Sequence, residues 1–588
     1  MIFCKNVPVY IQGLLIYLLI CTVDIFLCFI YYYLPIIFQG KKMKRFIIVL
    51  LLSLTPAIFC FADMPYALFV ENDHWIYDAM HILSVESRQT TLADRQPLSK
   101  GELAEYFSTF ENAAIPQASE PLYRMMQGYF SGHSFLFTRK YFTFDVNGIF
   151  TLQGQYVHNR ENEPRLDSFL RYNRTPAVVS IPMHVMFTRY VDFFANLSLK
   201  KNYWAAEFSY PYTNLPLEGN AFDASFPTQA GLSLGNYFFN LTIGRGALNI
   251  GRSLAGSMLL ADTVDRMDYI TASFFYKKVR LALNVLELAP TRFVFSHEAS
   301  FRPINWITLR FYEGIVLNAP FDPKYLNPMM IFHNFFGWRE KTFNANASEE
   351  SGKSSIGCQF GIGLDVVPIR GLRLYGQYGQ NQFQTSFELK NYPAARNIPN
   401  SLGGLAGVEY IHPFSFGHLS VTGEFLYANP WMYIMENKHI SLYHRRKDTV
   451  AGKGMTNSEI AIWVANPYGP DTMGAFLQIT LTEPQKYRAK LGYRFLVKGE
   501  NEDNFFDPSK EKPGKPGIYY PDANHYESIA QAKTPSANPA YFHTISLGGS
   551  YRVIKQLDLN AGLNWTIVSG RKKGHAVDIY SSVKYTIR

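Results

Sequence analysis

Apolar and polar residues alternate along much of the chain, from about residue 141 to its end. Val279, Leu281 and Leu283 alternate with polar or small neighbours, and the same pattern runs from Val191 to Lys200. Alternation with a period of two is typical of a strand that has one apolar face. Segments of about ten residues with this pattern are long enough to cross a membrane within a β-barrel. The sequence therefore predicts an all-β fold, a transmembrane antiparallel β-barrel.

The facing of single residues follows from the same alternation. Between Val191 and Lys200, we expect Phe193 and Leu197 to face lipid and Asp192 and Asn196 to face the lumen. Roughly 450 barrel residues, at about 25 to 28 per strand and loop, predict about 16–18 strands.

The connections between the expected strands are of two kinds. Short turns such as 368–371 contrast with long polar loops at 159–176, 340–355, 437–457 and 499–540. In outer-membrane barrels the short turns are periplasmic and the long loops lie outside the cell. The last segment, Val577 to Arg588, also alternates, as expected of a final strand that closes the barrel against the first.

Two apolar segments precede the barrel. Residues 43–62 form a complete secretory signal, with a basic start at Met43, an apolar middle and a small-residue cleavage site ending at Ala62. We therefore expect the mature chain to begin at Asp63 and residues 1–42 to be a mis-assigned upstream extension. The alternative is a membrane anchor, because residues 6–23 are nearly long enough to span a bilayer.

Residues 63–120 are expected to form a small helical segment, with the barrel occupying residues 121–588. Ile76, Met80 and Leu83 follow helical spacing, and Asp73 is a candidate N-cap. Ser99 and Glu102 have the spacing of a capping box, which predicts a second helix. The segment is either a periplasmic domain or a helical linker.

Composition narrows the possible classes. The chain of 588 residues is 18% charged and 16% aromatic, with a mean hydropathy of −0.08, which excludes a helical membrane bundle. Its net charge of +9 falls to +5 without residues 1–62, which hold five basic residues and one acidic residue. The remaining charge is spread along the chain and gives little support to nucleic-acid binding. Cys358 is alone in the expected mature chain, so no internal disulfide is expected.

Candidate catalytic motifs receive little support. The segment Gly231 to Gly235 matches a nucleophile elbow around Ser233, but that chemistry needs a strand-to-helix turn, and an alternating strand follows here. The histidines have no partner that the sequence identifies, and no Cys/His cluster has zinc spacing. We therefore expect no enzymatic activity, no metal and no cofactor.

Short motifs occur in an order that resembles the capsule assembly Wzi family. They are Gly244-Arg245-Gly246, Asn249-Ile250-Gly251-Arg252, Ser257-Met258-Leu259-Leu260-Ala261-Asp262, Tyr312-Glu313-Gly314, Tyr325-Leu326-Asn327-Pro328, Gly363-Leu364-Asp365, Gly371-Leu372-Arg373-Leu374-Tyr375, Gly407-Val408-Glu409-Tyr410, Gly423-Glu424-Phe425 and Tyr468-Gly469-Pro470-Asp471. The chain departs from the family pattern at His297-Glu298, where His-Arg is expected.

The resemblance implies an outer-membrane barrel that binds or anchors surface or capsular polysaccharide without cleaving it. Its implied location is the outer membrane, and its implied partners are that polysaccharide, outer-membrane lipid and the barrel-assembly machinery. The alternative function is an outer-membrane porin or solute channel.

Six residues are candidates for ligand binding or for lining the lumen. Arg245, Arg252 and Glu313 are expected in the barrel interior, either paired in a closed barrel or lining a pore. Trp431, Tyr519 and Tyr520 lie in expected loops, where aromatic faces could stack on sugars, although aromatic residues are also common at membrane interfaces.

Overall fold

The computed structural model describes residues 64–132, 135–139, 141–223, 227–332, 356–391, 399–435, 438–449, 457–506 and 532–587. The expected upstream extension and signal peptide lie outside these residues and stay predictions. Among the described residues, no helix is long and apolar enough to span a membrane.

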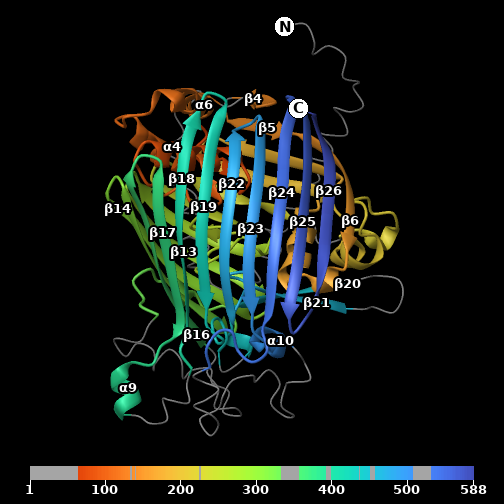
Figure 1. Cartoon of the computed structure of the whole chain (residues 1–588). Helices are drawn as coiled ribbons and strands as arrows, with labels where there is room; N and C mark the ends of the chain where they lie inside the picture. Colours follow the sequence, from red (N-terminus) through yellow and green to blue (C-terminus); the bar gives the residue numbers. More distant parts are fainter. Residues whose placement is uncertain are drawn as a thin grey trace, which may run out of the picture. The chain divides into compact units, whose positions relative to one another are not determined.

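Eighteen antiparallel strands of the described chain close into a barrel, which confirms the predicted fold (Figure 1). The first strand, β6, pairs along its length with the last strand, β26, and so joins the two ends of the sheet. The strands are β6 (Gly148–His158), β7 (Val179–Phe187), β8 (Val191–Leu199), β9 (Gln229–Gly235), β10 (Phe239–Gly246), β12 (Met267–Tyr276), β13 (Val279–Ala289), β14 (Arg292–Ile304), β15 (Ile307–Asn318), β16 (Ile356–Ile369), β17 (Leu372–Gln382), β18 (Ser401–Phe414), β19 (Gly417–Ala428), β22 (Thr472–Glu483), β23 (Tyr487–Lys498), β24 (Ala540–Ile554), β25 (Leu557–Gly570) and β26 (Gly574–Ile587). β5 (Phe142–Val146) precedes β6 and extends its pairing with β7, and the short β4 (Phe137–Arg139) flanks β5.

The long connections lie together at one end of this barrel, and the strands are joined by short turns at the other end (Figure 1). Two short turns, 289–292 and 570–574, lie at the same end as the long connections. The turn between β16 and β17 needs a glycine, because Gly371 has φ +81 and an added Cβ would lie 2.6 Å from the carbonyl oxygen of Ile411. The connection between β6 and β7, expected as a polar loop, contains the helix α7 (Arg165–Arg174). We call the two ends the short-turn end and the loop end.

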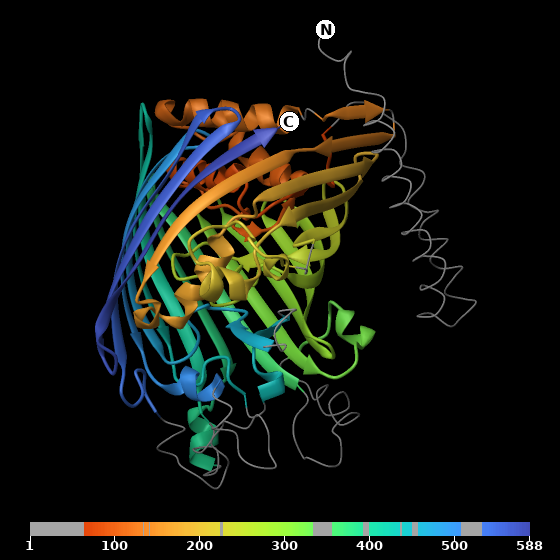
Figure 2. The ribbon, with the colours of Figure 1, turned by 90° about the vertical axis from the view of Figure 1, so that its right-hand side faces the viewer.

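Three helices form a plug, residues 64–131, at the short-turn end (Figure 2). They are α4 (Trp75–Glu86), α5 (Lys100–Phe107) and α6 (Glu120–Ser131), so the helical part runs past the expected limit at residue 120. Ser99 caps α5 as predicted, but the cap of α4 is His74 rather than Asp73, because the His74 ring accepts the amide hydrogen of Ile76. Two short strand pairs tie the plug together and to the lumen: β1 (Phe69–Val70) with β3 (Leu98–Ser99), and β2 (Arg95–Gln96) with β11 (Asn249–Ile250).

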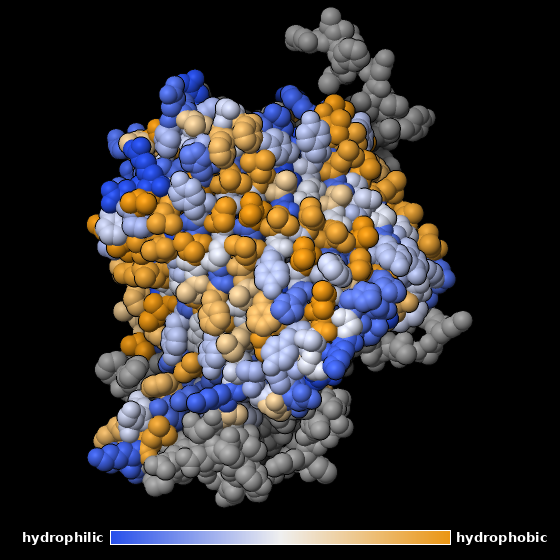
Figure 3. Space-filling view, in the orientation of Figure 1, coloured by the Kyte–Doolittle hydropathy of each residue, from blue (hydrophilic) through white to orange (hydrophobic). Residues whose placement is uncertain are grey.

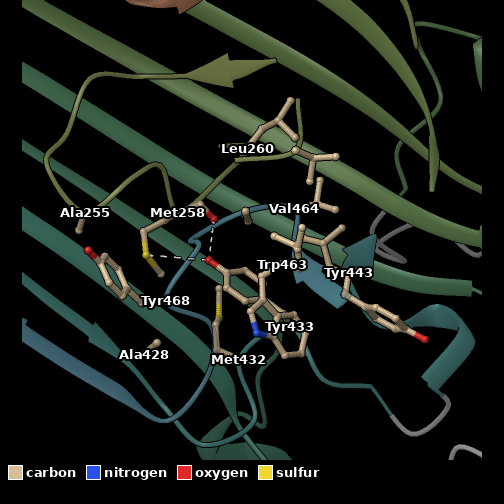
Figure 4. Packing of buried hydrophobic residues seen from close by; sticks show 14 of the residues in the cluster. Ala255, Met258, Leu260, Ala428, Met432, Tyr433, Tyr443, Trp463, Val464 and Tyr468 are labelled. Carbon is tan, nitrogen blue, oxygen red and sulfur yellow. Dashed lines mark hydrogen bonds between the residues drawn. The ribbon is translucent and has the colours of Figure 1, made fainter. Parts of the chain in front are cut away.

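The loop end of the interior is filled by connections that fold inward (Figure 4). Residues of the segments 254–264, 428–434, 442–443 and 461–468 pack into one apolar cluster with inward side chains of the wall such as Leu405 and Leu426. Tyr433 donates its hydroxyl hydrogen to the carbonyl oxygen of Met258 at 3.1 Å, which joins two of these connections. The cluster lies inside the barrel, so it is a core rather than a lipid-facing surface.

The outer wall is apolar, as the alternation predicts (Figure 3). Leu197 is exposed on it, whereas Asp192 is fully buried and accepts the amide hydrogen of Phe69 in the plug at 2.9 Å. Other exposed apolar side chains include Leu477, Leu491, Leu547, Trp565 and Ile579. The alternation of apolar and polar residues along each strand therefore produces both a lipid-facing exterior and a polar interior that contacts the plug.

Candidate functional site

Buried ion pairs hold the plug to the inner wall. Glu298 on β14 accepts hydrogen bonds from Arg95 of the plug at 3.1 Å and from Arg280 on β13 at 2.8 Å. Arg280 also donates to Glu102 of α5 at 2.8 Å. All four side chains are almost completely buried, and buried charges persist when they are paired. Glu298 is therefore the acid between two arginines.

A second chain of pairs runs along the neighbouring strands. Asp94 of the plug and Asp365 on β16 both accept from Arg310 on β15. Asp365 also accepts from Arg373 at 2.5 Å, and Arg373 reaches Glu409 at 3.3 Å. Two further contacts join α4 to the wall: His81–Glu409 at 2.8 Å and Glu86–His418 at 2.7 Å. The plug is thus bonded to the wall through charged groups on several strands.

A polar cavity of about 270 Å³ lies between the plug, the wall and the inward-folded residues 249–262. Asp78 of α4 accepts there from Arg252 at 2.6 Å and from Arg488 at 2.8 Å. Burial alone would raise the pKa of Asp78, but the two guanidinium groups outweigh it and hold that pKa well below its usual range. Burial raises the pKa of Asp262, which also lines the cavity. The cavity is polar and is bordered by the contacts that retain the plug.

The three charged candidates do not lie together. Arg252 is in the interior as expected, paired with Asp78. Arg245 and Glu313 are not, which corrects the prediction that both belong to the interior. Arg245 shares its face of β10 with the exposed Ile243 and forms two 2.8 Å hydrogen bonds with Asp268 on the outer wall.

Glu313 likewise faces outward on β15, because Arg310 and Tyr312 of the same strand point inward and are buried. Its cross-strand neighbour is the outward His297, whose ring stacks on Phe332 at 4.4 Å. Glu313 therefore does not pair with Arg245 or Arg252.

Of the three aromatic candidates, the structure describes Trp431. Trp431 is 2% exposed within the inner apolar cluster, so it has no face free for a sugar, which corrects that prediction. Tyr519 and Tyr520 lie outside the described residues and stay predictions.

An aromatic group that the sequence indicates only in part, through Phe505 and Phe506, lies at the loop end. Trp463 is buried against Tyr443, Phe505 and Phe506, and its indole nitrogen donates to Glu502 at 3.0 Å. The ring of Phe506 is partly exposed, and the guanidinium of Arg165, from α7, lies 4.4 Å from its centroid. The exposed guanidinium of Arg165 thus lies over the partly exposed ring of Phe506, and it also donates to Glu502 at 3.1 Å. The Phe505-Phe506 dipeptide was a signal for this group, but its partners are distant in sequence.

The nucleophile candidate has a structural partner. Ser233 is fully buried on β9, and its hydroxyl oxygen accepts from Asn240 at 2.9 Å. Within the described part of the chain, no group of three or more His, Cys, Asp or Glu residues is arranged to hold a metal ion. The expectation that the protein is not an enzyme stays a prediction.

These features define a plugged barrel with the fold of bacterial outer-membrane proteins. No family model and no curated protein matches the sequence. Among solved structures, the chain is similar to Wzi of Escherichia coli, an outer-membrane protein involved in group 1 capsule assembly and described as a carbohydrate-binding β-barrel. The identity is 13% and the TM-score 0.52, over 88% of this chain and 99% of Wzi. It also matches OprD of Pseudomonas aeruginosa at 8% identity and a TM-score of 0.38, over 76% of this chain and 95% of OprD. At these identities the similarity concerns the fold alone.

Proposed function

We propose that this protein is an outer-membrane barrel that binds a surface polysaccharide at its loop end and does not cleave it. The observation that carries the proposal is an interior occupied from both ends: by the plug with its buried ion pairs, and by the inward-folded apolar cluster. The similarity to Wzi, itself described as carbohydrate-binding, supports the same class.

The energetic argument separates a binding protein from an open channel. Breaking a buried ion pair by removing one partner costs about 3–5 kcal/mol, and the plug makes several such pairs with the wall. A route through the barrel would also have to displace the apolar cluster around Trp463 and Tyr433. Such an interior favours a protein that acts through its outer surface.

A solute channel is the second candidate, and one observation favours it. Lys490 is exposed on the inner face of β23, near Arg488, and Ser550 on β24 is partly exposed there. Part of the interior is therefore polar and solvent-accessible, as a channel wall would be.

The exposed pair Arg165–Phe506 is the contact we assign to the glycan. Sugar hydroxyls accept hydrogen bonds from guanidinium groups, and the apolar faces of sugars pack against aromatic rings such as the partly exposed ring of Phe506. The test is retention of surface polysaccharide on cells of a strain that carries either the wild-type protein or the double variant Arg165→Ala/Phe506→Ala. We expect the variant to release polysaccharide into the medium. The matched control is Phe416→Ala, which removes an exposed aromatic ring in a turn at the opposite end.

Equal retention by the wild type and the double variant, with both proteins folded and present at equal level, would remove Arg165–Phe506 as the site. Loss of retention in the control as well would show a general effect of exposed aromatic residues rather than a glycan site.

A further inference from the structure

The barrel wall has a seam between β6 and β7. Along the described ranges of the two strands they pair at Ile149 and Phe150 alone, whereas β6 pairs with β26 from Gly148 to His158. Beyond Phe150 the strands diverge, and irregular segments lie between them (Figure 2). An unpaired strand edge in a membrane wall needs other hydrogen-bonding partners.

A strap, residues 210–215, supplies those partners. The carbonyl oxygen of Tyr212 accepts from the amide of Gln155 at 2.9 Å. The backbone amide of Asn214 donates to the carbonyl oxygen of Gln153 at 3.3 Å. The side chain of Asn214 is fully buried: its Oδ1 accepts from the amide of Gln153 at 2.9 Å, and its Nδ2 donates to the carbonyl oxygens of Thr151 at 2.8 Å and Pro176 at 3.2 Å. One polar side chain therefore replaces part of a strand pairing.

An apolar groove of about 890 Å³ leads away from the strap. Thr213 and Leu215 of the strap line one end of it, together with Leu152 of β6. Its floor is a row of small residues that are neighbours in register across five strands: Gly154, Ser581, Ala561, Gly549 and Ala489.

The groove lies on the outer, lipid-facing wall. Leu152, Val583 and Leu559, which rim it, are each more than 40% exposed, whereas Gln153 and Ser582 on the inner face of the same strands are buried. Five strands at about 4.8 Å spacing give the groove a length of about 20 Å. One leaflet of the hydrocarbon core is about 15 Å thick. A straight apolar chain of leaflet length fits this floor.

We propose that the groove is a binding site for one acyl chain of a membrane lipid, with the strap as its end wall at the seam. Lipid is the medium that faces this wall, and the small side chains leave room that bulky ones fill elsewhere on the same surface. The strap is fixed to β6 by the hydrogen bonds of Tyr212 and Asn214, so it closes that end of the groove. The chain of a bound lipid therefore ends against Leu215 and Thr213.

The test is photo-crosslinking of the mature protein in bilayer nanodiscs. The probe is a phosphatidylethanolamine with a diazirine on its palmitoyl chain, and labelled peptides are quantified by mass spectrometry. We expect peptides from β6, β25, β26 and residues 210–217 to be labelled at least fivefold more than those from β17 and β18. Ala561→Phe, which fills the floor, is expected to reduce that excess labelling at least fivefold.

The matched control is Ala406→Phe, an exposed small residue on β18 that does not line the groove. We expect it to leave the labelling unchanged. Ser581→Leu serves as a second filling variant, and heat-modifiable migration on gels reports folding of each. Uniform labelling of all lipid-facing strands, or labelling that survives both filling variants, would overturn the proposal. Crosslinks between two copies across the groove would assign it to a protein partner instead. None of these outcomes depends on glycan binding.

Discussion

Glu298 offers the sharpest test of how the plug is held. Glu298 accepts hydrogen bonds from both Arg95 and Arg280. The substitution Glu298→Gln removes its negative charge with little change of side-chain shape. Arg280 keeps Glu102 as a partner, whereas Arg95 keeps two uncharged acceptors, the side-chain oxygen of Asn284 at 2.5 Å and the carbonyl oxygen of Gln96 at 3.5 Å. Because the side chain of Arg95 is 2% exposed, we expect the uncompensated charge to destabilise the plug by about 3–5 kcal/mol.

The assay is limited trypsin digestion of the folded protein in detergent, with urea titration to give the free energy of plug opening. We expect residues 64–131 of Glu298→Gln to be cleaved at lower urea while the barrel stays heat-modifiable. Adding Arg95→Met removes the unpaired charge and should restore much of the resistance. Asp558→Asn is the control, because its pair with Arg552 is partly exposed and worth less than about 1 kcal/mol. A cost below about 1 kcal/mol for Glu298→Gln would refute the reasoning.

Three further predictions concern the seam, pH and the facing of a strand. Asn214→Ala removes three buried hydrogen bonds and should lower the free energy of unfolding, measured by urea titration, by about 3 kcal/mol. The control Asn564→Ala removes a half-buried lumenal asparagine and should lower it by less than about 1 kcal/mol, and equal losses would contradict the role of Asn214 at the seam. The folded pKa of Asp78 is lowered from 3.8, so its stabilisation is present above that value and is lost as pH falls below it. Protease sensitivity of the plug should therefore rise below about pH 4 in the wild type. It should rise less in Asp78→Asn, where only the other ion pairs of the plug lose carboxylate charge, and equal rises would contradict the role of Asp78. Phe193→Arg should destabilise the barrel by about 2–4 kcal/mol, while Asn196→Arg should be tolerated, and equal effects in unfolding titrations would reject the assigned faces.

The strands could be predicted from the sequence because a period of two is a local property. The predictions for single residues that were wrong have different causes. Arg245 has the same parity as Leu241 and Ile243, so the outward face was readable in the pattern, but the assumption that charges belong inside overrode it. Its partner Asp268 makes the outward position tolerable.

Other features depend on contacts that no local pattern contains. Arg95 and Glu298 are 203 residues apart, and their pairing requires the plug to sit inside the barrel. Trp431 lies in a connection that reads as an external loop, and its burial results from that connection folding back onto the inner wall. The strap at Asn214 has no signal beyond a Pro- and Asn-containing stretch between two strands.

The measurement that tests the central claim most directly is the ion conductance of the purified mature protein in planar lipid bilayers. The account predicts no stable open-channel current for the wild type, because the plug blocks the interior at one end and the apolar cluster blocks it at the other. Stable conductance steps from the folded wild-type protein, at a size expected of an open barrel, would contradict it and favour a solute channel.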